Sequence, residues 1–195
     1  MQKKIVPQCK NIPPYVYWED VFKEEDIIEL QKLASRAENY ANVGGPDGQP
    51  VFDKQIRSAK VFWLHNCPEM DKFYERLGYV IENLNREFFG FDLEGFGEPI
   101  QLTNYNSSYS GKYDWHCDFN STISRKLSLV LQLSEPSEYE GGFLEIMGHD
   151  GTILQIDKKQ NYLVAFPSWA LHRVTPVTAG HRQSLVSWIS GQPFK

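Results

Sequence analysis

The chain has 195 residues and a net charge of −5, with 41% apolar, 23% charged and 14% aromatic residues. That length suffices for one substantial hydrophobic core, and the composition is that of a folded globular protein. No apolar run is long enough to span a membrane, no signal-peptide core follows the first residues, and the acidic balance opposes a long track of phosphate contacts. We therefore expect a single cytoplasmic domain over residues 1–195, with no membrane or nucleic-acid partner; the oligomeric state stays open.

The cysteines exclude two further classes of site. Cys9, Cys67 and Cys117 are an odd number, lie far apart in the sequence and form no C-x-x-C pair. A disulfide framework and a zinc ribbon are therefore not expected.

Residues 1–98 predict a helical support layer with a loop and a strand. Residues 23–37 carry apolar side chains at helical spacing, and the turn-rich residues 39–53 predict a flexible loop, either a lid over a site or an ordinary surface loop. Residues 55–64 alternate as a strand does. A second helix, opened by Pro68 and ended by Gly90, carries a long apolar stripe: Met70, Phe73, Tyr74, Leu77, Ile81, Leu84 and Phe88.

Residues 99–195 predict the β-rich core. Turn residues separate eight candidate strands: 100–105, 113–118, 126–134, 143–147, 152–155, 161–166, 172–177 and 183–190. Eight short strands suffice for a double-sheet jelly roll. The expected fold is therefore α+β, mainly β: a jelly roll, or double-stranded β-helix, supported by N-terminal helices.

A candidate metal site lies within these strands. His116 and Asp118 are two apart, so on a strand both side chains reach the same face while Cys117 points away as a packing residue. His172 follows about fifty residues later and opens another strand. Two histidines and one carboxylate form the facial triad of non-haem Fe(II) oxygenases, which leaves positions open for cosubstrate and O₂. The remaining histidines are expected in loops or turns: His65, His149 and His181.

A candidate anion site lies ten residues beyond His172. Arg182 shares one strand face with Ser184, Val186 and Trp188, and an arginine on an inner face requires an anionic partner. A planar guanidinium suits a carboxylate. The alternative is an edge arginine paired with a surface glutamate. On strand 126–134 the leucines fill one face, so Gln132 is expected on the pocket face.

Together these residues resemble the Fe(II)- and 2-oxoglutarate-dependent dioxygenases, in their prolyl 4-hydroxylase-like branch. The resemblance covers residues 99–190, and the lead from 17 to 91 fits the branch's N-terminal support layer. It rests on five elements: Tyr105, Tyr113-Asp114-Trp115-His116-Cys117-Asp118, Gly141-Gly142-Phe143-Leu144-Glu145-Ile146, Phe166-Pro167-Ser168, and His172 with Arg182.

The resemblance implies the cofactors and their residues. His116, Asp118 and His172 would bind Fe(II), and Arg182 would bind the distal carboxylate of 2-oxoglutarate. Tyr105 and Ser184 would help line the cosubstrate pocket. Gln132 stands where some prolyl hydroxylases place a tyrosine, a departure that affects the details of cosubstrate binding. Ascorbate would serve as the reductant.

The resemblance also implies a substrate. Arg125 and Trp188 fall where peptidyl-prolyl hydroxylases contact the substrate proline, which favours hydroxylation of proline in a peptide or protein, with succinate and CO₂ as co-products. Trp188 in the core and a solvated Arg125 are the alternatives. Three rival functions are a free-amino-acid or other small-molecule hydroxylase, a non-catalytic jelly-roll binding protein, and a nucleic-acid demethylase, which would carry a second arginine where this chain has Trp188.

Overall fold

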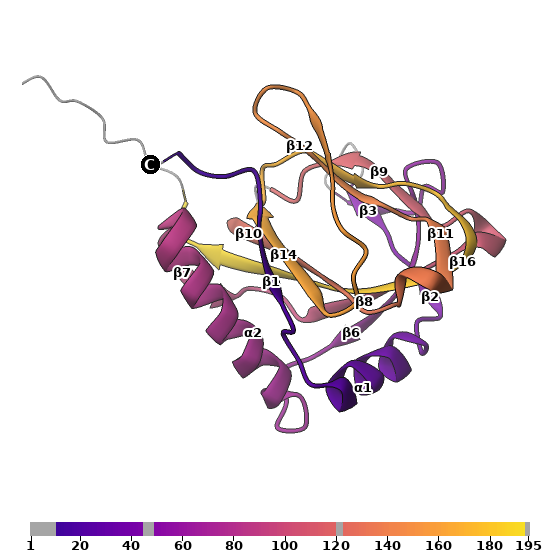
Figure 1. Ribbon diagram of the computed structural model, residues 1–195, viewed down its shortest axis with the longest axis horizontal. Coiled ribbons are helices and arrows are strands. Elements are labelled where there is room, and N and C mark those ends of the chain that lie inside the picture. The colour runs from indigo at the N-terminus through magenta and orange to yellow at the C-terminus, as the bar shows by residue number, and fades with distance from the viewer. Residues whose placement is uncertain (1–10, 45–48, 120–122, 194–195) are drawn as a thin grey trace, which may run out of the picture.

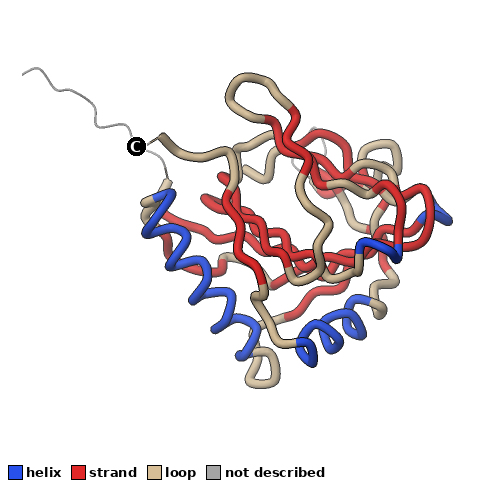
Figure 2. The backbone as a smooth tube through the Cα atoms, viewed as in Figure 1, coloured by secondary structure: helices blue, strands red, loops and turns tan. Residues whose placement is uncertain are grey.

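A computed structural model describes residues 11–44, 49–119 and 123–193. Cys9 and residues 45–48 of the predicted loop lie outside these ranges. The described chain is built from two antiparallel sheets that face one another, with two helices on the outer face of the larger sheet (Figures 1 and 2). It is therefore mainly β with helical support, as the sequence predicts.

The larger sheet has nine strands. Its main path runs β1 (Val16–Glu19), β14 (Tyr162–Pro167), β10 (Arg125–Gln132), β16 (Val177–Gly191), β8 (Ile100–Asn106), β6 (Lys60–Leu64) and β2 (Asn39–Tyr40). Two further strands, β7 (Leu93–Phe96) and β11 (Tyr139–Gly141), also pair with the long β16. The N-terminal strands thus extend the same sheet as the C-terminal ones.

The smaller sheet faces the middle of the larger one. Its strands run β13 (Ile153–Gln155), β12 (Leu144–Met147), β15 (His172–Val174), β9 (Lys112–His116) and β5 (Arg57–Ser58). A separate hairpin joins β3 (Val43–Gly44) to β4 (Pro50–Val51), within the segment predicted as a loop. Short 3-10 turns precede β9 (η2, Ser107–Tyr109) and β11 (η3, Pro136–Glu138).

The two helices cover the outer face of the larger sheet. Helix α1 spans Glu24–Ala34, three residues short of the predicted end, because the chain tightens into turns in which Ala37 N–H bonds to the carbonyl of Ala34. Helix α2 spans Asp71–Leu84 and continues as a π-helical turn, η1 (Asn85–Phe89). The cap is Gly90 at φ +69°, a left-handed conformation that glycine adopts without strain.

Two apolar cores follow from the alternation of side chains along β10 and β16. The leucines at 127, 129, 131 and 133, with Leu185 and Ile189, pack under the helices. Residues of the opposite faces point into the space between the sheets, where a second core contains Val130, Val164 and Phe166. The predicted division of faces on both strands is confirmed, and the face that lies away from the helices is the one that builds the site.

Several predicted boundaries are wrong. The strand predicted at 172–177 is interrupted, because Pro176 has no N–H for a ladder bond and β16 begins only at Val177. His181 was expected in a turn and lies in β16 with an exposed side chain. The sequence also missed β1, β7 and β11, whose short lengths give little periodicity.

No helix in the described ranges is long and apolar enough to cross a membrane.

Tyr74 offers a test of how the helical layer is attached. Its buried hydroxyl donates to the Leu64 carbonyl at 2.6 Å and accepts from Ile100 N–H at 3.1 Å, which ties α2 to the paired ends of β6 and β8. We expect Tyr74→Phe to lower the free energy of unfolding by about 1–3 kcal/mol, because two buried backbone groups lose their partner. Urea denaturation measures it. Tyr79→Phe on an exposed position of the same helix is the control, and an equal loss in both variants would contradict the prediction.

Candidate metal centre

The two histidines of the predicted triad face each other across neighbouring strands. His116 ends β9 and His172 begins β15, and the two residues are direct partners in the antiparallel ladder. Their ring centroids lie 4.1 Å apart. A cross-strand pair brings side chains from distant parts of the sequence to one face, so the sheet itself assembles two of the three candidate ligands.

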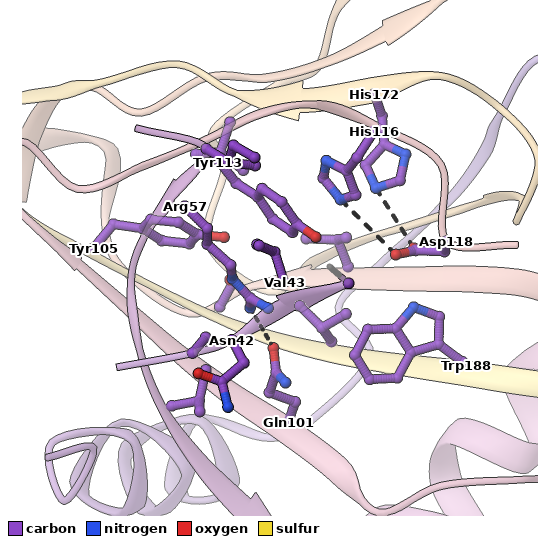
Figure 3. Close-up of a pocket in the computed structure, with 18 of the residues that line it drawn as sticks. Asn42, Val43, Arg57, Gln101, Tyr105, Tyr113, His116, Asp118, His172 and Trp188 are labelled. Atoms are coloured by element: carbon purple, nitrogen blue, oxygen red, sulfur yellow. Dashed lines mark hydrogen bonds and ion pairs between the residues drawn. The ribbon is translucent and has the colours of Figure 1, made fainter. Parts of the chain in front are cut away.

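Asp118 reaches the histidines from a loop. The predicted strand 113–118 ends at His116, so the expectation that one strand presents both His116 and Asp118 is wrong. Instead, the N–H groups of Asp118 and Phe119 both donate to the carbonyl of Ser168 at 2.9 Å. This turn directs the Asp118 carboxylate toward the histidines (Figure 3). Its oxygens lie 3.8 Å from Nε2 of His116 and 3.5 Å from Nε2 of His172.

The three side chains form a donor set suited to a metal. Each residue offers one ligand atom, a ring nitrogen or a carboxylate oxygen, and these three atoms lie within 4.8 Å of one another. Nδ1 of His116 lies 2.7 Å from the Asp114 carbonyl, and Nδ1 of His172 lies 2.9 Å from the Ala170 carbonyl. A carbonyl can only accept, so each Nδ1 carries the proton and each Nε2 presents a lone pair. Two imidazoles and a carboxylate fit Fe(II).

The electrostatics keep the donors in the form that binds metal. Burial, followed by the neighbouring His172, lowers the pKa of His116 to about 3, so its imidazole is neutral near pH 7. Burial raises the pKa of Asp118, but His172, His116 and the Ser128 hydrogen bond outweigh it and the net pKa is lowered. Ser128 Oγ donates to Asp118 Oδ2 at 2.7 Å and lies 3.0 Å from Ser168 Oγ.

A cavity of about 770 Å³ contains the triad and most of the other predicted site residues. Among its lining residues are Tyr105, Arg125, Arg182, Ser184 and Trp188. Residues 39–44 of the predicted loop also line it. Whether this segment moves as a lid stays a prediction.

Arg182 is fully buried in this cavity and has no acidic partner among the described residues. Its Nη2 donates to Gln132 Oε1 at 2.9 Å, its Nη1 to Ser184 Oγ at 3.3 Å, and its Nε has no partner. A guanidinium stays charged at any physiological pH, and burying it without an anion costs several kcal/mol. The alternative of an edge arginine paired with a surface glutamate is therefore wrong, and the site has the chemistry of a carboxylate receptor.

Glycine makes room for this arginine. Gly142 has φ +61°, and a Cβ there would approach Cδ of Arg182 to 3.2 Å and Cγ2 of Val177 to 2.9 Å. The Gly141-Gly142 pair seen in the sequence is thus explained by backbone conformation and close approach.

The two predicted substrate residues stack on each other. The Arg125 guanidinium lies 4.1 Å from the ring centroid of Trp188 and forms a two-point ion pair with Glu98, at 2.5 and 2.6 Å. Arg125 is therefore neither solvated nor unpaired, because Glu98 satisfies most of its charge. Trp188 is buried, as the core interpretation predicts, and it also lines the cavity, so its contact with substrate stays a prediction.

Sequence reasoning missed several residues of the site. Arg57, Gln101 and Trp63 line the cavity from β5, β8 and β6, and Ser128 holds Asp118. Alternation placed Ser128 on the correct face, but nothing in the sequence indicated that Asp118 would meet it. Conversely, Gln132 contacts Arg182 without lining the cavity.

Cys117 corrects another expectation. It is exposed, and its thiol donates to the Trp169 carbonyl at 3.2 Å, so it is not an interior packing residue. His65 is exposed beyond β6, and His149 lies in a turn, as predicted for both.

Comparison with known proteins gives consistent similarities. Residues 100–190 match the family model described as the 2OG-Fe(II) oxygenase superfamily. A PKHD-type hydroxylase of Synechococcus sp. (strain CC9311) is 36% identical over 102 residues, which are 50% of this chain and 46% of that protein. One from Xylella fastidiosa (strain M12) is 27% identical over 180 residues, covering 84% and 75%. In several of these matches, the chain spans less than half the length of the curated relative.

Solved structures share the fold. A prolyl-4-hydroxylase from Pseudomonas putida superposes with a TM-score of 0.72 at 20% identity, over 93% of this chain and 94% of that one. A prolyl hydroxylase from Trichoplax adhaerens, in complex with a peptide fragment of the hypoxia inducible factor oxygen degradation domain, gives 0.75 at 16% identity, over 92% and 84%. At these identities the likeness establishes the jelly-roll fold.

The stability of an arginine variant tests whether Arg182 is unpaired. We expect Arg182→Met to leave the free energy of unfolding of the ligand-free protein unchanged or raised, because it removes a buried charge that has no counter-ion and keeps a similar volume. Leu185→Ala on the same strand is the control, and it should cost about 2–5 kcal/mol. Urea denaturation measures both. A comparable loss in Arg182→Met would indicate an anionic partner within the fold.

Proposed function

We propose that this chain, whose residues 100–190 match the family model of the 2OG-Fe(II) oxygenase superfamily and which shares the fold of a solved prolyl-4-hydroxylase, is a 2-oxoglutarate- and O₂-dependent Fe(II) hydroxylase. Its substrate in this proposal is proline within a peptide or protein, and its co-products are succinate and CO₂. The family implies Fe(II) and 2-oxoglutarate as cofactor and cosubstrate. Ascorbate is proposed as the reductant that restores Fe(II).

One observation carries the proposal. A triad of His116, Asp118 and His172 shares a cavity with a fully buried guanidinium that has no acidic partner among the described residues. A metal site alone would fit many proteins. A metal site beside the buried Arg182 guanidinium fits a cosubstrate such as 2-oxoglutarate, which can chelate the metal at one end and present a carboxylate to the arginine at the other.

The proposed roles follow from the contacts of each residue. Bound Fe(II) with 2-oxoglutarate supplies O₂ activation coupled to loss of CO₂ from the 2-oxo acid. The histidines present Nε2 because Asp114 and Ala170 hold each Nδ1 proton. Ser128 fixes the Asp118 carboxylate, and Arg182 with Ser184 binds the distal carboxylate of the cosubstrate. Tyr105 packs beside Arg182 and, with the buried apolar walls, excludes water.

The peptide substrate is supported by one structural neighbour and by an aromatic face in the cavity. Relatives are named as hydroxylases without a stated substrate, and one structural neighbour is described with a bound peptide. In this chain Trp188 offers an aromatic face in the cavity, held by the Arg125–Glu98 pair. Hydroxylation of a free amino acid or another small molecule is the second candidate, because the cavity contains a further buried cation, Arg57, that has no acidic partner among the described residues. The cytoplasmic location and the single domain over residues 1–195 stay predictions.

Substitution of the triad tests the reaction. We expect His116→Ala and Asp118→Ala to abolish succinate formation from 2-oxoglutarate, because each removes one of three metal ligands. Arg182→Met should instead raise the 2-oxoglutarate concentration required by about ten- to hundredfold, the worth of a lost charged hydrogen-bonded pair. Succinate release, with Fe(II) and ascorbate present, measures these effects. Unchanged turnover in all three would exclude this mechanism.

Binding without turnover distinguishes an enzyme from a binding protein of the same fold. Anaerobic addition of Fe(II) and then 2-oxoglutarate should give the visible metal-to-ligand absorption band in the wild type. Mass spectrometry of proline-containing peptides after aerobic incubation should then show the gain of one oxygen. A band without any oxygenated product would favour the small-molecule hydroxylase, and no band would favour the non-catalytic protein.

Ser128→Ala tests the support of the carboxylate. Because Ser128 orients Asp118, we expect its loss to weaken Fe(II) affinity by about tenfold or more while leaving the fold intact. Ser187→Ala is the matched control, since Ser187 is equally buried and its hydroxyl has no partner. Competition with a metal-binding dye measures the affinity. Equal affinities in the two variants would contradict the role given to Ser128.

A further inference from the structure

A second buried arginine lines the cavity apart from Arg182. Arg57 lies on β5 at the edge of the smaller sheet and is 8% exposed. Figure 3 shows its guanidinium between Tyr105 and Tyr113, above Gln101 and beside residues 42 and 43 of the loop segment. Arg182 comes from β16 in the opposite sheet, so the cavity has two distinct cationic positions.

The partners of Arg57 are neutral. Its Nη2 donates to Gln101 Oε1 at 2.7 Å, its guanidinium lies 4.5 Å from the ring centroid of Tyr113, and its buried Nε has no partner. Gln101 Oε1 also accepts from Thr103 Oγ1, which fixes the amide oxygen toward the arginine. No carboxylate of the described residues pairs with it.

These contacts satisfy only part of the hydrogen-bonding capacity and charge of the Arg57 guanidinium. One neutral hydrogen bond and one ring contact leave most of five N–H donors and a full charge to be matched. The carboxylates nearby are committed elsewhere: Glu98 to Arg125, and Asp118 to the histidines and Ser128. A buried cation in a cavity, with no anion supplied by the fold, is matched to an anion that enters from solvent.

We propose that Arg57, oriented by Gln101, binds a carboxylate of the substrate, so that the enzyme selects acidic substrates. This inference rests on the proposed function, because it assigns Arg182 to 2-oxoglutarate and leaves Arg57 for the second reactant. A planar carboxylate matches the guanidinium fork in a two-point contact. Three sources supply the group: the α-carboxylate of a free amino acid, the C-terminus of a peptide, and an aspartate or glutamate side chain near the hydroxylated residue.

The position of Arg57 suits substrate rather than cosubstrate. It stacks on Tyr113, which in turn stacks on His116 with ring centroids 3.4 Å apart. The carboxylate would therefore sit on the His116 side of the metal centre, next to residues 42–44 that line the cavity. The same stack offers a merely structural role, in which Arg57 holds Tyr113 against His116.

Matched acid and amide probes test the proposal. The pairs are L-proline and L-prolinamide, acetyl-Gly-Pro and its C-terminal amide, and acetyl-Glu-Pro-Gly-amide and acetyl-Gln-Pro-Gly-amide. Calorimetry on protein loaded with Mn(II) and saturating 2-oxoglutarate measures binding without turnover, with the cosubstrate site filled. We expect the wild type to bind the acid of at least one pair about ten- to hundredfold more tightly than its amide. The pair that discriminates identifies the source of the carboxylate.

Variants assign that preference to the residue. Arg57→Gln should abolish it, and Arg57→Lys should keep part of it, because lysine retains the charge without the fork. Lys54→Gln removes a positive charge from an exposed neighbour outside the cavity lining and should leave it unchanged. The wild type and the three variants should bind Mn(II) and 2-oxoglutarate with the same affinity. If Arg57 instead had a structural role through Tyr113 and His116, its variants would bind Mn(II) more weakly.

Three results would overturn the proposal: equal binding of acid and amide in every pair by the wild type, an undiminished preference in Arg57→Gln, or a loss of preference in Arg57→Gln that comes with a loss of Mn(II) affinity. The wild-type comparison stands even if a variant fails to fold. Failure of the proposed function has a different signature, namely no oxygenated product and no succinate while the acid preference in binding persists.

Discussion

The site depends on one strand pairing. Because β9 and β15 are antiparallel neighbours with His116 opposite His172, two imidazoles from distant parts of the sequence meet on the inner face of the smaller sheet. The Ser168 carbonyl then turns the chain after β9 so that Asp118 faces both. A shift of one residue in this pairing would send one histidine to the outer face. The register of the smaller sheet is therefore the constraint on which the metal centre rests.

Each of the two sheets contributes one buried arginine to the cavity between them. Two arginines lie in the shared cavity without acidic partners among the described residues, Arg182 on β16 and Arg57 on β5. Each is a cost to folding that the apolar layer beneath the helices offsets. Arg125, which does have an acidic partner, acts differently, since its pair with Glu98 makes it a support for Trp188. The arginine that has an acidic partner, Arg125, supports the site, whereas Arg57 and Arg182, which have none among the described residues, are the proposed anion-binding groups.

This distinction bears on the substrate, which the metal centre cannot specify by itself. Under the proposed function, the triad and Arg182 would serve any substrate that reaches the cavity. Outside the triad and Arg182, two pairs in the cavity could select a substrate. One is the aromatic pair Trp63 and Trp188, whose ring centroids lie 6.3 Å apart, and the other is the Arg57–Gln101 pair. An aromatic wall suits a proline ring and a guanidinium suits a carboxylate, so both features are compatible with an acidic peptide or a free amino acid.

The sequence by itself determined the elements whose signal is local. Period-two alternation divided β10 and β16 into a leucine face and a pocket face, and the apolar stripe fixed α2, because neighbouring residues on an element share their environment. The spacing of His116, Asp118 and His172 indicated a candidate triad, and the structure brings these three side chains together. Only the tertiary structure decided that Asp118 is placed by a loop, that Arg125 meets Glu98, and that Arg57 enters the cavity without a partner. Those facts depend on contacts between segments far apart in the chain, where no periodicity carries information.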